Sequence, residues 1–438
     1  MIHLLDNIIF TLLLGAGVGY FAWQVKKTIR NIKLGKPYDR TDRKNERWKN
    51  VLLVAFGQKK MFKRPIPALL HLAVYLGFII INIEVIEIII DGVFGTHRVL
   101  KFAGPFYDFL IASFEVLAFL VIVAVTLFWI RRNIIKLRRF NMPEMEGWPK
   151  KDANYILYFE FVLMTAFLTM NAADKKLQLL NHPHYDQAGS FPVSSFLLNI
   201  LPEDPSSLVM IERSMWWIHI IGILIFLNYL YFSKHYHILL AFPNVFYAKL
   251  PPLAKLDNLE SVKKEVELML DPNADPYASP PDENEEPGRF GAKDIFDLKW
   301  INLLNAYTCT ECGRCTSVCP ANQTGKLLSP RKIMMSVRDR TEEVSKIIDK
   351  KGKFEDDGKS LLDYITPEEI WACTTCNACV EECPVMIDPL DIIIQIRQYM
   401  VMEESAAPAE LNLMFTNIEN NGAPWQYSQA DRLNWVNE

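Results

Sequence analysis

The chain has 438 residues, half of them hydrophobic, and its mean hydropathy lies just above zero. This length exceeds that of one ordinary domain, and the apolar content is too high for a wholly soluble protein. We therefore expect a membrane part and a soluble part. The formal net charge of -4 is small for the length, which argues against nucleic acid and against any single strongly charged partner.

Five segments are long and apolar enough to cross a bilayer. They cover residues 7–25, 67–90, 109–130, 153–173 and 214–233. The first could instead be a cleaved signal peptide, but no basic residue precedes its apolar run, so we expect it to remain as a helix.

The loops between these segments differ in basic residues. Residues 26–66 and 131–151 contain several pairs of Lys or Arg, whereas 91–108 and 174–212 contain few basic residues. Basic loops stay on the cytoplasmic side of a membrane. The pattern predicts a multi-pass protein of a prokaryotic cytoplasmic membrane, with the N-terminus outside and the C-terminal part in the cytoplasm.

All eight cysteines lie in two runs with the spacing C-x2-C-x2-C-x3-C-P. Three closely spaced thiolates hold three corners of a 4Fe–4S cluster, and in two-cluster ferredoxins the fourth ligates the other cluster. We therefore predict two clusters, one on Cys309, Cys312, Cys315 and Cys383 and one on Cys373, Cys376, Cys379 and Cys319. Structural zinc is the alternative. Ligand cysteines need a reducing compartment, which again favours the cytoplasm.

Three histidines near the predicted spans have the placement of haem ligands. His219 and His237 are eighteen residues apart, so on one continuous helix they would share a face about 27 Å apart. That distance approaches the thickness of the hydrocarbon core and suits two stacked b-type haems. His71, at the cytoplasmic start of the second span, lies at the depth of His237 and could share one haem with it. Each histidine could instead be a buried hydrogen-bonding residue.

The stretches His71–Phe78 and His219–Ile238 resemble the ligand helices of the nitrate reductase gamma-subunit cytochrome family. The resemblance implies one haem b between His71 and His237. In that family each ligand helix carries two histidines, but here Ile81 stands where the second histidine of its helix is expected. His219 could therefore bind a second haem alone, with His97 as its other ligand, or not at all.

Carboxylates interrupt the apolar spans at Glu84, Glu87 and Glu115. A carboxylate in lipid is costly and needs a partner or a task. We predict proton handling beside a membrane quinone, with salt bridges or contacts to a haem edge as the alternative.

The region that holds the cysteines resembles the helical ferredoxin of the heterodisulfide reductase iron–sulfur subunits and their relatives. The resemblance rests on Tyr307–Cys315, Leu328–Lys332 and Trp371–Cys376, with Asn377 standing where the family usually has Gly. The tail, Asn420–Trp435, is similar to the junction before the cysteine-rich catalytic domain of fused members. Because the clusters use every cysteine, we expect a separate partner, either a cysteine-rich heterodisulfide reductase-like subunit or a flavoprotein.

Together these features predict an all-α protein in four parts. They are a five-helix membrane cytochrome-like domain (1–250), an acidic Pro-rich linker (251–289), a helical ferredoxin domain (290–405) and a partner-docking tail (406–438). The predicted role is electron transfer between a cytoplasmic partner and a quinone, and the resemblance implies menaquinone. The alternatives are a quinol-oxidising subunit of a disulfide or sulfur reductase and a redox-responsive scaffold without turnover.

Overall fold

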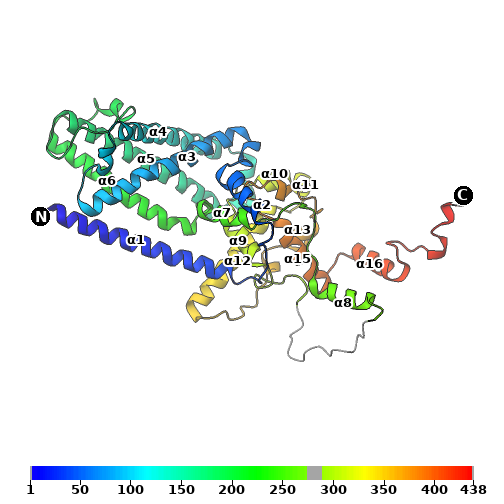
Figure 1. Ribbon diagram of the computed structural model, residues 1–438. Helices are drawn as coiled ribbons and strands as arrows, with labels where there is room; N and C mark the ends of the chain where they lie inside the picture. The colour runs from blue at the N-terminus through cyan, green and yellow to red at the C-terminus, as the bar shows by residue number, and fades with distance from the viewer. Residues whose placement is uncertain (1, 274–288, 437–438) are drawn as a thin grey trace.

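The computed structural model describes residues 2–273 and 289–436, and its described residues form helices and loops without a strand, apart from one isolated bridge between Lys36 and Lys299. A bundle of long helices is joined at one end to a compact group of shorter helices (Figure 1). We call the joined end of the bundle the inner end and the opposite end the outer end. The predicted all-α architecture is confirmed.

Five helices of the described residues are long and apolar enough to cross a membrane. They are α1 (Ile2–Ile32), α3 (Pro65–Phe94), α4 (Pro105–Asn133), α5 (Trp148–Leu179) and α6 (Pro205–Tyr229). Four begin with proline in their first turn, where a missing N–H costs nothing. Neighbours in sequence pack together from α3 to α6, while α1 lies against α3 and α6. Large apolar side chains such as Phe78 and Val162 face outward, as lipid contact requires.

The expectation that one helix carries both His219 and His237 is wrong. Helix α6 ends at Tyr229, a 3-10 turn follows at Leu230–Phe232, and Ser233 is extended with φ −111° and ψ 149°. His237 opens a separate helix, α7 (His237–Phe246). The Asp152 carboxylate from α5 holds the break, since it accepts hydrogen bonds from the Tyr229 hydroxyl at 2.6 Å and the Lys234 amide at 3.0 Å.

The compact group follows the bundle in the chain. Its helices are α9 (Trp300–Thr308), α10 (Arg314–Val318), α11 (Pro320–Gln323), α12 (Pro330–Lys351), α13 (Pro367–Trp371), α14 (Ala378–Glu382) and α15 (Pro389–Met402). We call it the cluster domain. Short helices α2 (Lys44–Asn50) and α7 lie at its junction with the bundle, and α8 (Glu260–Leu270) precedes residues 274–288 of the predicted linker, which lie outside the described residues. Helix α16 (Ala409–Asn421) extends away from the rest (Figure 1).

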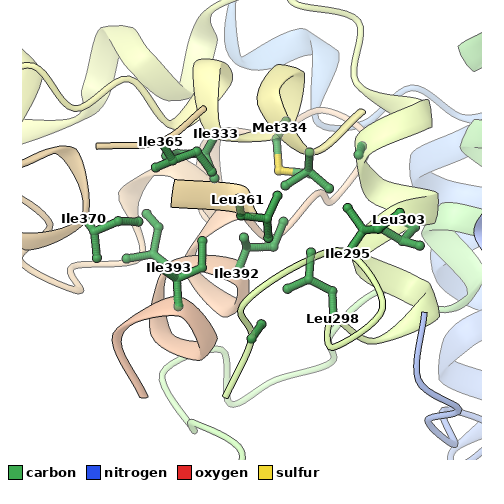
Figure 2. Packing of buried hydrophobic residues seen from close by; sticks show 14 of the residues in the cluster. Ile295, Leu298, Leu303, Ile333, Met334, Leu361, Ile365, Ile370, Ile392 and Ile393 are labelled. Carbon is green, nitrogen blue, oxygen red and sulfur yellow. The ribbon is translucent and has the colours of Figure 1, made fainter. Parts of the chain in front are cut away.

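The core of the cluster domain is aliphatic. Side chains from five segments meet in Figure 2, among them Ile295, Leu303, Ile333, Leu361 and Ile392, all with no exposed surface. Burying each such side chain contributes roughly 1.5–3 kcal/mol. This packing fixes the loops that carry the cysteines between α9, α10, α12 and α15.

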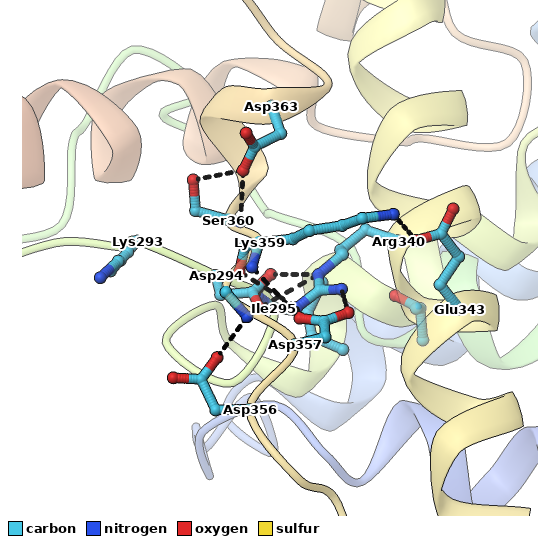
Figure 3. A network of polar contacts seen from close by, with 12 residues as sticks. Lys293, Asp294, Ile295, Arg340, Glu343, Asp356, Asp357, Lys359, Ser360 and Asp363 are labelled. Atoms are coloured by element: carbon cyan, nitrogen blue, oxygen red, sulfur yellow. Dashed lines mark hydrogen bonds and ion pairs between the residues drawn. The ribbon is translucent and has the colours of Figure 1, made fainter.

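One buried arginine ties the entry of the cluster domain to its longest helix. Arg340 of α12 is fully buried and forms ion pairs with Asp294 at 2.7 Å and Asp357 at 2.6 Å (Figure 3). Both carboxylates accept two-pronged hydrogen bonds from the guanidinium. The network joins the segment before α9 to the loop after α12.

Ion pairs also connect the bundle to the cluster domain. Three of them are Arg30–Asp349 (2.6 Å), Arg64–Glu382 (2.8 Å) and Glu144–Arg331 (2.6 Å). The bundle residues of these pairs belong to the two basic loops or to the end of α1. Both basic loops therefore meet the cluster domain at the inner end.

Candidate functional site

The first group of cysteines surrounds one small cavity beside α10. Cys309 follows α9, Cys312 and Cys315 flank the start of α10, and Cys383 follows α14, and all four line the cavity. Cys379 borders it as well. Burial raises the pKa of Cys309 to about 12 and that of Cys383 to about 11. Thiols this deeply buried lose their protons only to a strong cation, so the donor set fits an iron–sulfur cluster.

The second group consists of Cys319, Cys373, Cys376 and Cys379. The charges of the other three act on Cys379, so the four lie close together. The two groups lie next to each other, because α10 packs against α14. The fourth cysteine of each run, Cys319 or Cys383, lies with the first three cysteines of the other run. Each group has one buried cysteine, Cys309 or Cys319, but the exposed cysteine, Cys376, belongs to the second group. The second group thus lies nearer the surface.

A left-handed residue shapes the turn in each run. Gly313 has φ +69°, and an added Cβ would lie 2.5 Å from the Arg331 guanidinium and 3.3 Å from Arg139. In the other run Asn377 takes the same place with φ 61°. Asn adopts this conformation more readily than most residues, so the exchange for Gly preserves the turn.

Three histidines gather at the inner end of the bundle. The charges of His71 and His237 both act on His235, and the rings of His235 and His237 are 5.6 Å apart. Burial, followed by these two neighbours, lowers the pKa of His235 to about 3. The sequence placed His71 beside His237 for haem but gave no role to His235, whereas the structure brings all three together.

The hydrogen bond of His237 suits a ligand. Its Nδ1 lies 3.0 Å from the Lys234 carbonyl oxygen, which can only accept, so Nδ1 carries the proton and Nε2 keeps its lone pair. His219 repeats this arrangement, with Nδ1 3.0 Å from the Leu163 carbonyl. Ligand histidines are commonly oriented in this way. Both residues therefore keep an Nε2 lone pair with which they could bind a metal.

His97 lies in the outer loop instead. Its Nε2 is 3.5 Å from Asp174, and its ring packs against Tyr185 with centroids 5.0 Å apart. The ring of His219 packs against Phe167, at 5.8 Å. The two histidines thus have different neighbours.

A cavity of about 460 Å³ opens at the outer end of the bundle. Its lining combines aromatic side chains, including Trp216 and Trp217, with buried charges, including Glu84 and Asp174. Glu84 is 2% exposed, and its Oε2 has no hydrogen-bond partner within the described ranges. Of Glu84, Glu87 and Glu115, it is Glu84 that has a free oxygen beside open space.

The other two carboxylates are occupied. Glu87 accepts hydrogen bonds from the Leu100 amide at 2.8 Å and the Tyr107 hydroxyl at 2.9 Å. Glu115 accepts from the amides of Val193 and Ser194, at 2.8 and 3.1 Å. These hydrogen bonds from neutral donors hold the outer loops and occupy the carboxylate oxygens of both residues.

An arginine to which the sequence gave no role organises this cavity. Arg98 donates to Asp174 at 2.6 Å, to Asn171 at 2.9 Å and to Tyr107 at 3.1 Å, and it lies 3.9 Å from Glu84. A single basic residue in an outer loop carries no motif. Only the packing of α3 and α5 around it reveals its role.

Comparison with known proteins supports the cysteine chemistry. The family described as "4Fe-4S dicluster domain" matches residues 308–387, which include both cysteine groups. The chain is 30% identical over 466 aligned residues to a probable iron-sulfur-binding oxidoreductase, FadF, of Bacillus subtilis, covering 99% of this chain and 61% of the relative. This chain is related to iron–sulfur oxidoreductases of the FadF and heterodisulfide reductase kind.

Two further relatives have more specific names. One is the EtfAB:quinone oxidoreductase of Syntrophomonas wolfei, 25% identical over 432 residues, 91% of this chain and 55% of the relative. The other is one subunit of the ferredoxin/F(420)H(2)-dependent CoB-CoM heterodisulfide reductase of Methanosarcina acetivorans, 32% identical over 118 residues, 27% of this chain and 60% of the relative. The chain spans about three fifths of the length of the first two relatives. No solved structure matches it.

Proposed function

We propose that the chain is the electron-transfer subunit of a membrane quinone oxidoreductase. It passes electrons between a cytoplasmic redox partner and a quinone, for which menaquinone is the candidate, through two 4Fe–4S clusters and haem b. The observation that carries this proposal is the position of Arg314. Its charge acts both on Cys312 of the first cysteine group and on His71 of the bundle, so the two redox sites adjoin.

Each predicted ligand has a role in this path. Cys309, Cys312, Cys315 and Cys383 would hold one cluster, and Cys373, Cys376, Cys379 and Cys319 the other. His71 and His237 would hold haem b, and His219 a second haem deeper in the bundle. When bound, these groups supply one-electron transfer. Helix α7, which begins at His237, packs against α9, which leads into Cys309, so the chain provides a continuous packed route.

Glu84 is the proposed proton-handling residue. Quinone reduction consumes two electrons and two protons, and the unpaired carboxylate oxygen at the outer cavity can exchange a proton with a bound headgroup. Trp216 and Trp217 offer apolar faces in the same cavity. His97 lies beside it through Asp174.

The basic loops support the proposed membrane orientation, and an exposed cysteine supports the proposed docking site of the partner. Both basic loops lie at the inner end beside the cluster domain, which supports a cytoplasmic cluster domain in an inner membrane. The exposed Cys376 supports a partner that docks over the second cysteine group. The name of the EtfAB:quinone oxidoreductase relative favours transfer of electrons from a protein partner to quinone. The proposed partner is a flavoprotein or a cysteine-rich heterodisulfide reductase-like subunit, and the relation to heterodisulfide reductases keeps the quinol-oxidising direction as the alternative.

The test uses anaerobically purified protein in lipid vesicles. We expect about eight cluster irons and one or two b haems per chain, and oxidation of reduced clusters on addition of a menaquinone analogue. Clusters that the quinone oxidises only slowly while the corresponding quinol reduces them fast would favour the reverse direction. Clusters that respond to neither form would contradict the proposal and favour the scaffold without turnover.

A further inference from the structure

The first cysteine group is surrounded by cations from both halves of the molecule. Arg314 of α10 is 3% exposed, and its charge acts on Cys312 and Cys383. Arg139, from the loop after α4, packs its backbone against Gly313 and acts on Cys312. Lys60, from the loop before α3, acts on Cys383. Two of these three cations reach the site only because the bundle docks on the cluster domain.

These three cations differ from three arginines near them. Arg64, Arg331 and Arg338 are neutralised by carboxylates at 2.6–2.8 Å, in the pairs Arg64–Glu382, Arg331–Glu144 and Arg338–Glu311. No ion pair of Lys60, Arg139 or Arg314 with a carboxylate occurs in the part of the chain that the structure describes.

The hydrogen bonds of the two arginines leave their charge intact. The Arg314 guanidinium donates to the backbone carbonyls of Lys60 at 3.3 Å and Met61 at 3.4 Å. The Nε of Arg139 is buried and has no hydrogen-bond partner among the described residues. A carbonyl satisfies a donor without cancelling its positive charge. Their field therefore extends to the first cysteine group.

The second cysteine group lacks such a surplus. Arg397 donates to the Cys373 carbonyl at 2.5 Å and stacks on Trp371, with 5.1 Å between guanidinium and ring. Opposite it, the Asp388 carboxylate is 5% exposed and its charge acts on Cys379. Lys249 lies 4.0 Å from that carboxylate. Because Lys249 pairs with Asp388, the second group keeps one uncompensated cation, Arg397, compared with three at the first group.

We propose that three cations raise the midpoint potential of the first cluster above that of the second. These cations are Arg139, Arg314 and Lys60. The proposal rests on the proposed function, because it assumes that both groups hold clusters. Accepting one electron adds one unit of negative charge at a cluster and requires no proton. Nearby cations in a low-dielectric site stabilise that added charge, and net charge is a main control of cluster potential.

Burial acts in the opposite direction. The first group is the more buried, and burial alone disfavours added charge. The cations are thus what makes the membrane-side cluster the better acceptor. Electrons that enter at the exposed second cluster would then collect next to His71, ready to enter the bundle. The charge of Arg314 acts on both Cys312 and His71, so this group of cations lies on the proposed electron path.

The experiment is an EPR-monitored redox titration of the whole purified protein. The two signals are first assigned with C312S and C376S, each of which removes one. We expect the first cluster to have the higher midpoint in the unaltered protein. In R139Q and R314Q its midpoint should fall, further in the double variant, while that of the second cluster stays fixed.

Matched variants separate charge from folding. R314K keeps the charge and should keep the midpoint, and K326Q removes an exposed lysine outside this cation group and should change nothing. Iron content must equal that of the unaltered protein. An unchanged first midpoint in R139Q and R314Q, equal shifts of both clusters, or a lower first midpoint in the unaltered protein would each overturn the proposal. Failure of quinone to oxidise either cluster would instead contradict the proposed function while leaving the midpoints measurable.

Discussion

The bundle and the cluster domain differ in what they expose. Both bury an apolar cluster together with some charged residues, but the cluster domain, with aliphatic residues such as Ile295 and Ile392 inside, leaves few large apolar side chains exposed. At its outer end the bundle encloses Arg98 and Asp174, while large apolar side chains such as Phe78 face outward. Water drives apolar groups inward, but lipid exerts no such force, so the bundle interior is free to hold polar groups provided that they find partners. This difference in surroundings explains why the outer cavity of the bundle can hold charged residues such as Arg98 and Asp174.

The largest expected effect tests how the cluster domain holds its metal. C383S should remove the same EPR signal as C312S, because both thiols line one cavity. C319S should instead remove the signal that C376S removes. Iron analysis should show loss of about half the cluster iron in each case. If C383S removed the signal that is missing in C376S, the crossed assignment would be wrong.

Loss of an inner histidine tests the bundle in the same way. H71A should abolish the absorbance of the inner haem while both cluster signals remain, because an axial nitrogen is lost. H182A is the control, since His182 lies at the outer cavity, away from the inner end. Reduced-minus-oxidised spectra provide the measurement, and full haem absorbance in H71A would refute this ligand assignment.

The buried ion pairs of Arg340 show how far the cluster domain depends on one of its buried charges. R340A leaves Asp294 and Asp357 without their shared cation and should destabilise the domain by about 3–5 kcal/mol. Thermal unfolding, followed through loss of the cluster absorbance, measures this effect. K359Q, which removes only a surface ion pair with Glu343, should leave unfolding unchanged. Equal unfolding temperatures for R340A and the unaltered protein would contradict the prediction.

Two carboxylates of the bundle, Glu84 and Glu115, differ in their hydrogen-bond partners, and mutation should show that their roles differ. E84Q should slow quinone reduction on the order of a hundredfold with cluster and haem content unchanged, because among Glu84, Glu87 and Glu115 the free oxygen at the cavity belongs to Glu84. E115Q keeps the size of the side chain but weakens its bonds to the outer-loop amides, so it should lower stability more than turnover. Stopped-flow quinone kinetics distinguish the two. A normal rate in E84Q would remove Glu84 from the proton path.

The smallest effect concerns the turn of the second cysteine run. N377A should destabilise the turn by about 1 kcal/mol, because alanine resists a φ of 61°. N377G should be tolerated, since glycine adopts this conformation freely. The temperature at which the second cluster signal is lost measures both. A stability order with N377A above N377G would show that the side chain of Asn377 has another role.

Local properties of the sequence were sufficient to predict much of the fold. Each predicted span lies within or nearly within an observed long helix, because a run of apolar residues satisfies its own backbone in a helix wherever the helix packs. Ser329 caps α12 by accepting from the Lys332 amide, and Pro330 occupies the first turn, and both are local signals of a helix start. The spacing of the cysteines likewise indicated a dicluster domain, which the family match supports.

Contacts between distant residues decided the rest. The helix through His219 stops before His237 because Asp152, some eighty positions earlier, binds the Lys234 amide. The three carboxylates have different partners only because separate loops fold over them, and Arg139 reaches Gly313 only because the two halves dock. Composition and residue spacing predict the structure that a segment adopts by itself. Which charge remains unpaired, and beside which ligand, depends on segments that meet only in the folded molecule.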